Sequence, residues 1–138
     1  MNGIDIVNIL VPKLLDLGFI VHRYNSHTTS SIYLKLDYGV SCGIRIADHL
    51  GKKKYRYRFN LIKNYNGNKA VNKDGLICYF YDFSELENVL EDVRNERQAK
   101  ITKYGIDRYK LYMENEKKEN ELFTRFKKIG GNYESSFR

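Results

Sequence analysis

Hydrophobic residues recur with helical spacing over residues 4–17 and predict a first helix there. Ile6, Leu10 and Leu14 fall on one face of this helix, and Gly18 follows as a C-terminal stop. Pro12 lacks a backbone donor, so we expect it to kink the helix or to restart it.

Five segments with strand-like patterns come next. They cover residues 19–24, 31–37, 42–47, 54–62 and 76–83. The second alternates clearly, with Ile32, Leu34 and Leu36 on one side and Tyr33 and Lys35 on the other. The fifth is apolar on both sides and is therefore expected to be more covered. Sequential strands joined by turns favour an antiparallel sheet with helices on one face.

Helical patterns return after the strands. Ser84 and Glu87 form a capping box at the start of a second helix. Its apolar stripe ends at Val93, so we expect the helix to leave the body of the protein there. Gly105 separates it from a last helix over residues 106–128. The final stretch, 130–138, is expected to be frayed or ordered by a partner.

The predicted class is therefore α+β, with an N-terminal helix, an antiparallel sheet of about five strands and C-terminal helices. The length of 138 residues suits one domain. Within it we expect a sheet domain at 1–93 and a helical extension at 94–138 that serves as an interaction or oligomerisation arm.

Two apolar patches in the extension are separated by the polar stretch 114–121. Isolated helices of this composition are marginal in water, so something must bury the patches. One possibility is that the last helix folds back on the sheet. The other, which we favour, is a homodimer that buries an interface. The residues concerned are Tyr109, Tyr112, Met113, Leu122, Phe123 and Phe126.

Charge is distributed unevenly along the chain. Residues 1–80 carry 12 Lys/Arg and 5 Asp/Glu, a balance of 12 − 5 = +7, whereas residues 81–138 carry 12 of each. A positive field of this kind attracts phosphates or an acidic protein surface. Alternation predicts a row of cations on one face of the sheet, with an aromatic ring beside them. This expected ligand-binding set is Lys35, Arg45, Lys54, Arg56, Arg58 and Tyr33.

Other candidate chemistry is sparse in the sequence. Cys42 and Cys78 lie far apart in apolar runs, which favours buried thiols and a reducing bacterial cytoplasm over a disulfide framework. No apolar stretch has the length of a membrane span. We find neither metal-ligand spacing nor a glycine-rich phosphate loop, and we expect neither metal nor cofactor. Asp48 and His49 are sequence neighbours, so on a strand they would point to opposite faces.

The segment around Leu17-Gly18-Phe19, followed by Asn25-Ser26-His27, resembles the opening of HicA-type toxin ribonucleases. That family has a double-stranded-RNA-binding-like fold, and its catalytic histidine follows a serine. The resemblance implies that His27 is the catalytic residue. Asn25 stands where the family has a glycine.

A second resemblance concerns the segment Ser30-Ser31-Ile32-Tyr33 followed by residues 44–49 (IRIADH). This pairing is similar to that in small phage and mobile-element proteins. Such proteins are often regulators, nucleic-acid binders or inhibitors of host defence, including anti-CRISPR proteins. We therefore expect a non-enzymatic accessory protein that binds nucleic acid or the acidic surface of a host nuclease complex. The alternatives are a HicA-like ribonuclease and a binder of a phosphate-bearing nucleotide signal.

Overall fold

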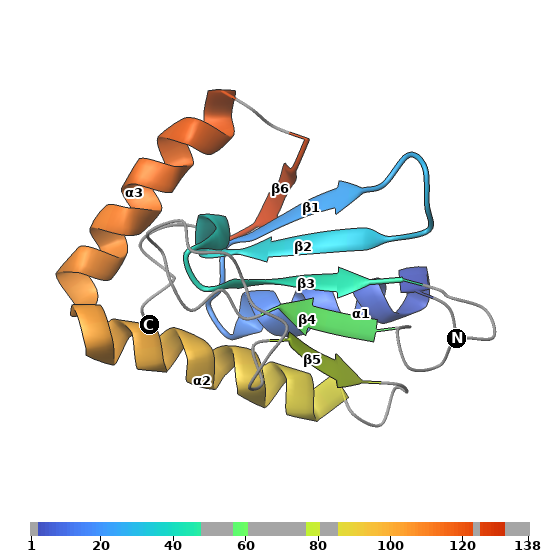
Figure 1. Ribbon diagram of the computed structural model, residues 1–138, viewed down its shortest axis with the longest axis horizontal. Helices are drawn as coiled ribbons and strands as arrows, with labels where there is room; N and C mark the ends of the chain where they lie inside the picture. Colours follow the sequence, from blue (N-terminus) through green and yellow to red (C-terminus); the bar gives the residue numbers. More distant parts are fainter. Residues whose placement is uncertain (1–2, 48–56, 61–76, 81–85, 123–124, 132–138) are drawn as a thin grey trace.

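Helix α1 (Gly3–Asp16) lies against one face of an antiparallel sheet (Figure 1), and its apolar residues are buried in a core shared with the strands. The computed structural model describes residues 3–47, 57–60, 77–80, 86–122 and 125–131. The helix runs through Pro12 without restarting, and Gly18 adopts φ of 88° just after it. Gly18 thus supplies the left-handed conformation that commonly ends a helix.

Within the described residues the sheet has six strands in the order β5-β4-β3-β2-β1-β6, and every neighbouring pair is antiparallel. The α+β class expected from the sequence is confirmed, with one strand more than the five anticipated. In chain order the strands are β1 (Val21–Asn25), β2 (Ile32–Leu36), β3 (Cys42–Ile46), β4 (Tyr57–Asn60), β5 (Ile77–Phe80) and β6 (Lys127–Gly130).

Strand β6 corrects the expectation of one helix over residues 106–128. Helix α3 (Ile106–Leu122) ends earlier, and the chain returns to pair with the open edge of β1. Gly131 explains why the chain can pass so close to that edge. A Cβ at this position would lie 2.5 Å from the carbonyl oxygen of Phe19, and its φ of 87° also favours glycine.

Among the described elements, two helices cover one face of the sheet. Helices α1 and α2 (Leu86–Tyr104) pack against the apolar side chains of the central strands. The most deeply buried members of this core are aliphatic or aromatic. They include Ile6, Leu10, Leu14, Phe19, Leu34, Leu36, Ile44 and Ile46. Buried and half-buried residues alternate along β2 and β3, as the sequence predicts.

Helix α2 does not leave the body at Val93, contrary to expectation. Arg97 and Lys100 continue its stripe at helical spacing and are 9% and 4% exposed. Lys100 donates to the carbonyl oxygen of Val40 at 2.9 Å and to that of Ser41. Burial lowers the pKa of Lys100 below its ordinary value. The stripe was missed because a pattern of apolar residues does not register buried cations.

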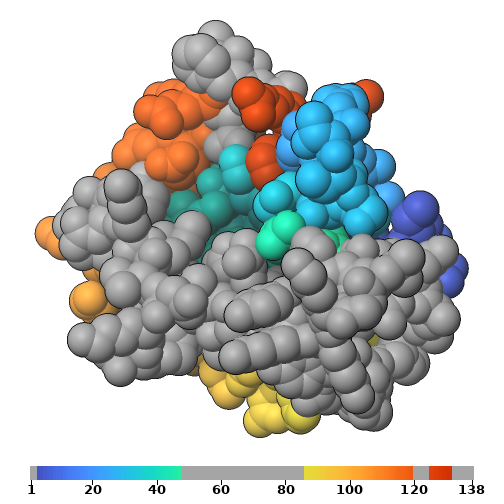
Figure 2. Space-filling model, turned by 45° about the vertical axis from the view of Figure 1, so that its right-hand side comes forward, coloured from blue at the N-terminus to red at the C-terminus, as the bar shows by residue number. Residues whose placement is uncertain are grey.

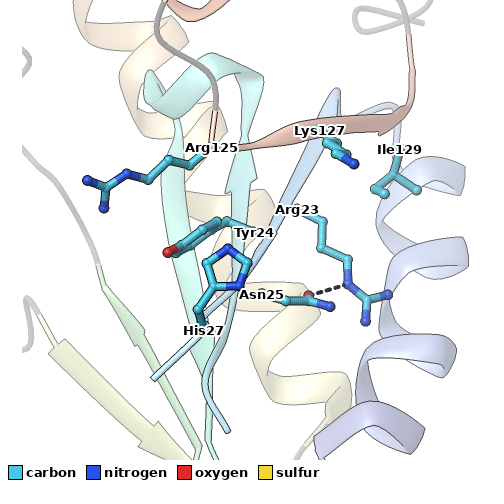
Figure 3. Close-up of a pocket in the computed structure, with 7 residues that line it drawn as sticks. All are labelled: Arg23, Tyr24, Asn25, His27, Arg125, Lys127 and Ile129. Carbon is cyan, nitrogen blue, oxygen red and sulfur yellow. Dashed lines mark hydrogen bonds between the residues drawn. The ribbon is translucent and has the colours of Figure 1, made fainter. Parts of the chain in front are cut away.

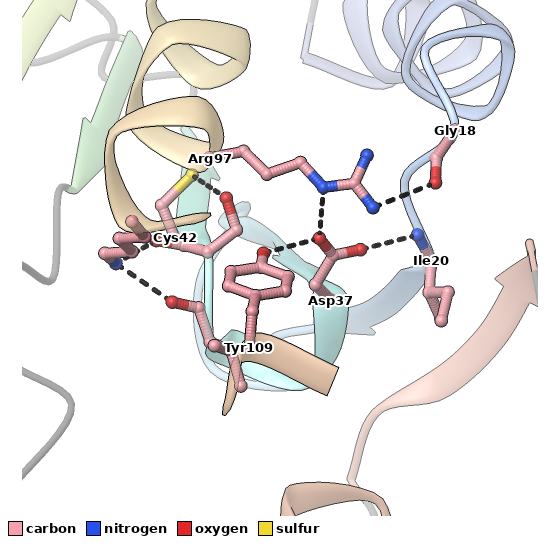
Figure 4. A network of polar contacts seen from close by, with 9 residues as sticks. Gly18, Ile20, Asp37, Cys42, Arg97 and Tyr109 are labelled. Atoms are coloured by element: carbon pink, nitrogen blue, oxygen red, sulfur yellow. Dashed lines mark hydrogen bonds and ion pairs between the residues drawn. The ribbon is translucent and has the colours of Figure 1, made fainter. Parts of the chain in front are cut away.

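Asp37 stands at the centre of a buried polar network (Figure 4). One carboxylate oxygen accepts from the Tyr109 hydroxyl at 2.7 Å and lies 2.9 Å from Nε of Arg97. The other accepts from the backbone N–H of Ile20 at 3.0 Å. Burial raises the pKa of Asp37, and the adjacent Arg97 guanidinium opposes that rise. Burial also raises the pKa of Tyr109, so its hydroxyl stays protonated and can donate.

Helix α3 folds back on the end of the sheet through this network. Tyr109 and Met113 are fully buried in a second apolar cluster with Ile20, Tyr38 and Val40. The first of the two apolar patches is therefore covered by its own chain. Tyr109 and Met113 have no exposed surface to offer the homodimer interface for which they were named, because the sheet end already occupies their faces.

The Asp37 network should dominate the stability of this fold. Asp37→Asn keeps the size of the side chain and its tolerance of φ near 53°, but removes the charge opposite Arg97. Removing one partner of a buried ion pair costs about 3 kcal/mol or more. We expect that loss in the free energy of unfolding, measured by denaturant titration. The matched variant Asp16→Asn changes an exposed carboxylate and should alter it by about 0.5 kcal/mol at most. Equal effects of the two variants would contradict a stabilising role for the network.

Candidate nucleic-acid interface

A basic cleft of about 570 Å³ opens where β1, the loop after it and the β6 segment meet (Figure 3). Arg23, Arg125 and Lys127 line it, and Tyr24 and His27 lie between the side chains of Arg125 and Arg23, which point apart. Among the described residues that line it, none is a carboxylate. The cleft therefore has the electrostatics of a phosphate site.

Local hydrogen bonds shape both walls of the basic cleft. Nε of Arg23 donates to the side-chain oxygen of Asn25 at 2.9 Å, which orients the guanidinium along β1. In the β1–β2 loop the Ser26 hydroxyl accepts from the backbone N–H groups of Thr28 and Thr29, each at 3.3 Å. This serine turn explains why a polar run holds His27 exposed at the mouth of the cleft.

Next to the cleft lies an aromatic cluster made of Tyr24, Tyr33 and Phe126. The ring of Tyr24 lies 6.0 Å from that of Tyr33 and 5.5 Å from that of Phe126, measured between centroids. His27 meets Tyr24 edge-on at 6.1 Å. Rings at these distances attract one another and expose flat apolar surface between charged neighbours.

Cations flank the aromatic cluster at close range. Nζ of Lys35 lies 4.3 Å from the centroid of Phe126, and the Arg45 guanidinium lies 6.0 Å from that of Tyr33. Arg45 is held in place because its Nε and one terminal nitrogen donate to the Ser31 hydroxyl at 3.2 and 3.0 Å. The surface thus combines cation–π contacts with anchored charge.

The structure brings together part of the cationic row expected from the sequence. Tyr33 pairs with Arg45 across β2 and β3, and Arg45 pairs with Arg58 across β3 and β4 in the backbone register. Lys54 and Arg56 lie outside the described residues. Tyr112 of the expected interface is half-buried and packs edge-on against Tyr104, whereas Phe126 joins the aromatic cluster. Phe123 is outside the described residues, and Leu122 is described only as the end of α3.

Sequence reasoning missed the cations of the basic cleft. Arg23 lies on the first predicted strand but was not included in the expected cationic row, and Arg125, Lys127 and Lys128 were assigned to a helix. The paired glycines at 130 and 131 gave no warning, because glycine just after residue 128 is also compatible with a helix that ends there. The partner strand lies about a hundred residues away, so no local pattern could identify it.

His22 lies on the same face of the sheet as Lys35. It is buried, contacts the ring of Tyr38 at 5.0 Å and pairs in register with Lys35 and Lys128. Burial lowers the pKa of His22 to about 4, and both lysines add to the shift. His22 is therefore neutral near pH 7, and its Nδ1 has no hydrogen-bond partner among the described residues.

Other candidate chemistry is limited within the described part of the chain. Cys42 is a buried thiol whose pKa burial raises to about 12. No group of three or more His, Cys, Asp or Glu residues gathers there as a metal site would require. His49, the third histidine, lies outside these residues. Within the described ranges, no helix has the length and apolar character to cross a membrane.

Comparison with known proteins identifies no relative of this chain. No family model matches the chain, and neither a curated protein nor a solved structure shows significant similarity to it. The fold and the site therefore define the molecule as an α+β protein with a basic, aromatic surface, and its function has to be argued from that surface.

The burial of His22 predicts a pH-dependent stability. Its pKa is about 4 in the folded chain and about 6.5 when unfolded, so between these values the unfolded chain binds more protons. The free energy of unfolding should therefore fall as pH is lowered from about 6.5 towards 4. His22→Gln cannot titrate and should show a smaller fall in denaturant titrations across this range. His27→Gln, which alters an exposed histidine, should behave as the wild type. An unchanged pH profile for His22→Gln would rule this explanation out.

Proposed function

We propose that this protein is a non-enzymatic nucleic-acid-binding protein whose ligand lies across the basic cleft and the aromatic cluster. The observation that carries the proposal is the gathering of Arg23, Arg125 and Lys127 around a cleft with no carboxylate among its described lining residues. Phosphate contacts supply most of the affinity of sequence-independent binding.

Aromatic side chains favour nucleic acid over an acidic protein as the ligand. An acidic protein surface needs cations alone, whereas nucleic acid also offers flat bases that stack on exposed rings. Tyr24 belongs to both features, since it lines the basic cleft and contacts Tyr33 and Phe126. A ligand with alternating phosphates and bases matches that arrangement.

The biological purpose in this proposal follows from the resemblance to phage and mobile-element proteins. An accessory protein in a bacterial cytoplasm could use such a surface to engage the nucleic acid of a host defence complex and block it. Self-association remains part of the proposal, and it would double the cationic surface. In that case the dimer would be formed by surfaces other than Tyr109 and Met113, which are buried.

The HicA-like alternative rests on one specific observation. His27 is exposed and lies at the mouth of a cleft with three cations, where a general base could reach a phosphodiester held by them. Against it, general acid–base cleavage needs a second proton-transfer group. His22 does not serve, because it is buried and neutral near pH 7.

Binding should depend steeply on salt and on the basic cleft. Arg125 and Lys127 are exposed, so Arg125→Glu with Lys127→Glu removes two phosphate contacts with little effect on folding. Each phosphate contact contributes roughly 0.7 to 0.9 to the slope of log affinity against log salt. The double variant should bind more weakly, with a slope shallower by roughly 1.4 to 1.8, in fluorescence anisotropy with labelled oligonucleotides.

A matched control distinguishes the effect of losing cations from the basic cleft from the effect of lowering the net charge. Arg94→Glu with Lys103→Glu makes the same change in charge at exposed positions on α2, outside the basic cleft. This control should retain most of the affinity and the wild-type slope. The proposal fails if both double variants lose affinity equally, or if the wild type binds neither DNA nor RNA at low salt.

The ribonuclease alternative can be tested on the wild type directly. We expect single-stranded RNA to remain intact in a gel-based cleavage assay, and expression of the protein to leave cells viable. Should cleavage appear, His27→Ala distinguishes the protein's own activity from a contaminating nuclease. Hydrolysis that His27→Ala abolishes would replace the non-enzymatic proposal with the ribonuclease.

A further inference from the structure

A small hollow of about 110 Å³ lies beside the aromatic cluster, on the sheet face that carries Lys35 and Arg45. Tyr33 and Phe126 both line it, and so does Gly43 of β3. It is distinct from the basic cleft, whose lining residues it does not share. In Figure 2 the residues near position 40, in teal, are set back between α3, in orange, and the cyan strand β2.

Gly43 keeps this hollow open. The backbone of β3 does not demand a glycine here, because Gly43 has no positive φ and pairs regularly with Lys35. A Cβ at this position would meet the carbonyl oxygen of Leu34 at 3.5 Å, which is ordinary contact. A side chain is therefore sterically permitted, and strands generally favour one. Glycine in mid-strand often marks a site where a ligand approaches the backbone closely.

The walls of the hollow define what it can hold. Two aromatic rings offer apolar surface for a planar group, and Lys35 and Arg45 supply positive charge at its rim. Bases stack on aromatic side chains in single-stranded complexes, whereas a duplex keeps its bases stacked inside. A planar base that carries phosphates on both sides fits both the rings and the cations.

We propose that the hollow at Gly43 receives one unpaired base of a single-stranded nucleic acid. This inference rests on the proposed function and names its ligand class. Phe126 follows Arg125 in the chain, so a strand with a base beside Phe126 can place a neighbouring phosphate at Arg125, which lines the basic cleft. Tyr24 lies between the two sites and contacts Phe126. In this proposal the hollow binds an unpaired base, and the basic cleft binds the adjoining sugar-phosphate backbone of the nucleic acid.

Gly43→Val tests this proposal without changing any charge. Valine suits a strand and fills the hollow. The probes are oligo(dT) and oligo(U) of about ten nucleotides, together with a base-free oligonucleotide that keeps the sugar-phosphate backbone. Affinity for a base-bearing probe should fall about tenfold or more, while affinity for the base-free probe stays unchanged. The polymer that shows the loss identifies DNA or RNA as the source of the base.

Tyr33→Leu provides a second variant that removes one ring and leaves the glycine and the cations in place. If circular dichroism shows that Gly43→Val does not fold, Tyr33→Leu takes its place. Tyr33→Leu should also lose affinity for the base-bearing probes and keep its affinity for the base-free probe. Unchanged binding of the base-bearing probes by a folded variant overturns the base site. An equal loss on base-bearing and base-free probes overturns it as well. Either result would confine the proposed ligand to the basic cleft, where the charge reversals at Arg125 and Lys127 test phosphate binding separately.

Discussion

The buried carboxylate of Asp37 connects the backbone after α1 with helices α2 and α3, which the sheet alone does not hold together. It accepts hydrogen bonds from the backbone after α1 and from Tyr109 on α3, and it pairs with Arg97 on α2. Buried charge is costly unless it is paired and hydrogen-bonded, so each of these donors must be in place at the same time. The constraint is stronger because Asp37 and Tyr38 adopt φ of 53° and 58°, a left-handed conformation that the surrounding contacts must stabilise.

This constraint reaches the candidate site through α3. With Tyr109 held against Asp37, the helix runs along the end of the sheet, and the chain beyond it returns to the edge of β1 (Figure 1). The return pairs Lys127 with Arg23, brings Arg125 to the same cleft and places Phe126 beside Tyr24. The basic cleft and the aromatic cluster therefore depend on the packing of α3, although Asp37 itself lines neither of them.

The candidate site could be foreseen from the sequence in part. Lys35, Arg45 and Tyr33 were assigned to one face because strict alternation along a strand places every second residue on the same side. For Arg45 the assignment also required that β2 and β3 be neighbours, and their register, which pairs Tyr33 with Arg45, meets that condition. Arg23 and Lys127 escaped it because they meet through the pairing of β1 with β6, which joins chain segments about a hundred residues apart. The same reasoning did not identify Gly43, because a residue without a side chain adds nothing to a pattern of polar and apolar positions.

The sequence by itself determined the class of the fold, the first helix and the central strands, because local periodicity records which side of each element is buried. It also determined the excess of positive charge, which is a property of composition. The tertiary structure alone decided that Arg97 and Lys100 are core residues, that Tyr109 and Met113 pack on their own chain, and that residues 127–130 form a strand. Each of these outcomes depends on which distant groups supply hydrogen-bond partners or apolar contacts, and that information is not present in any local stretch of sequence.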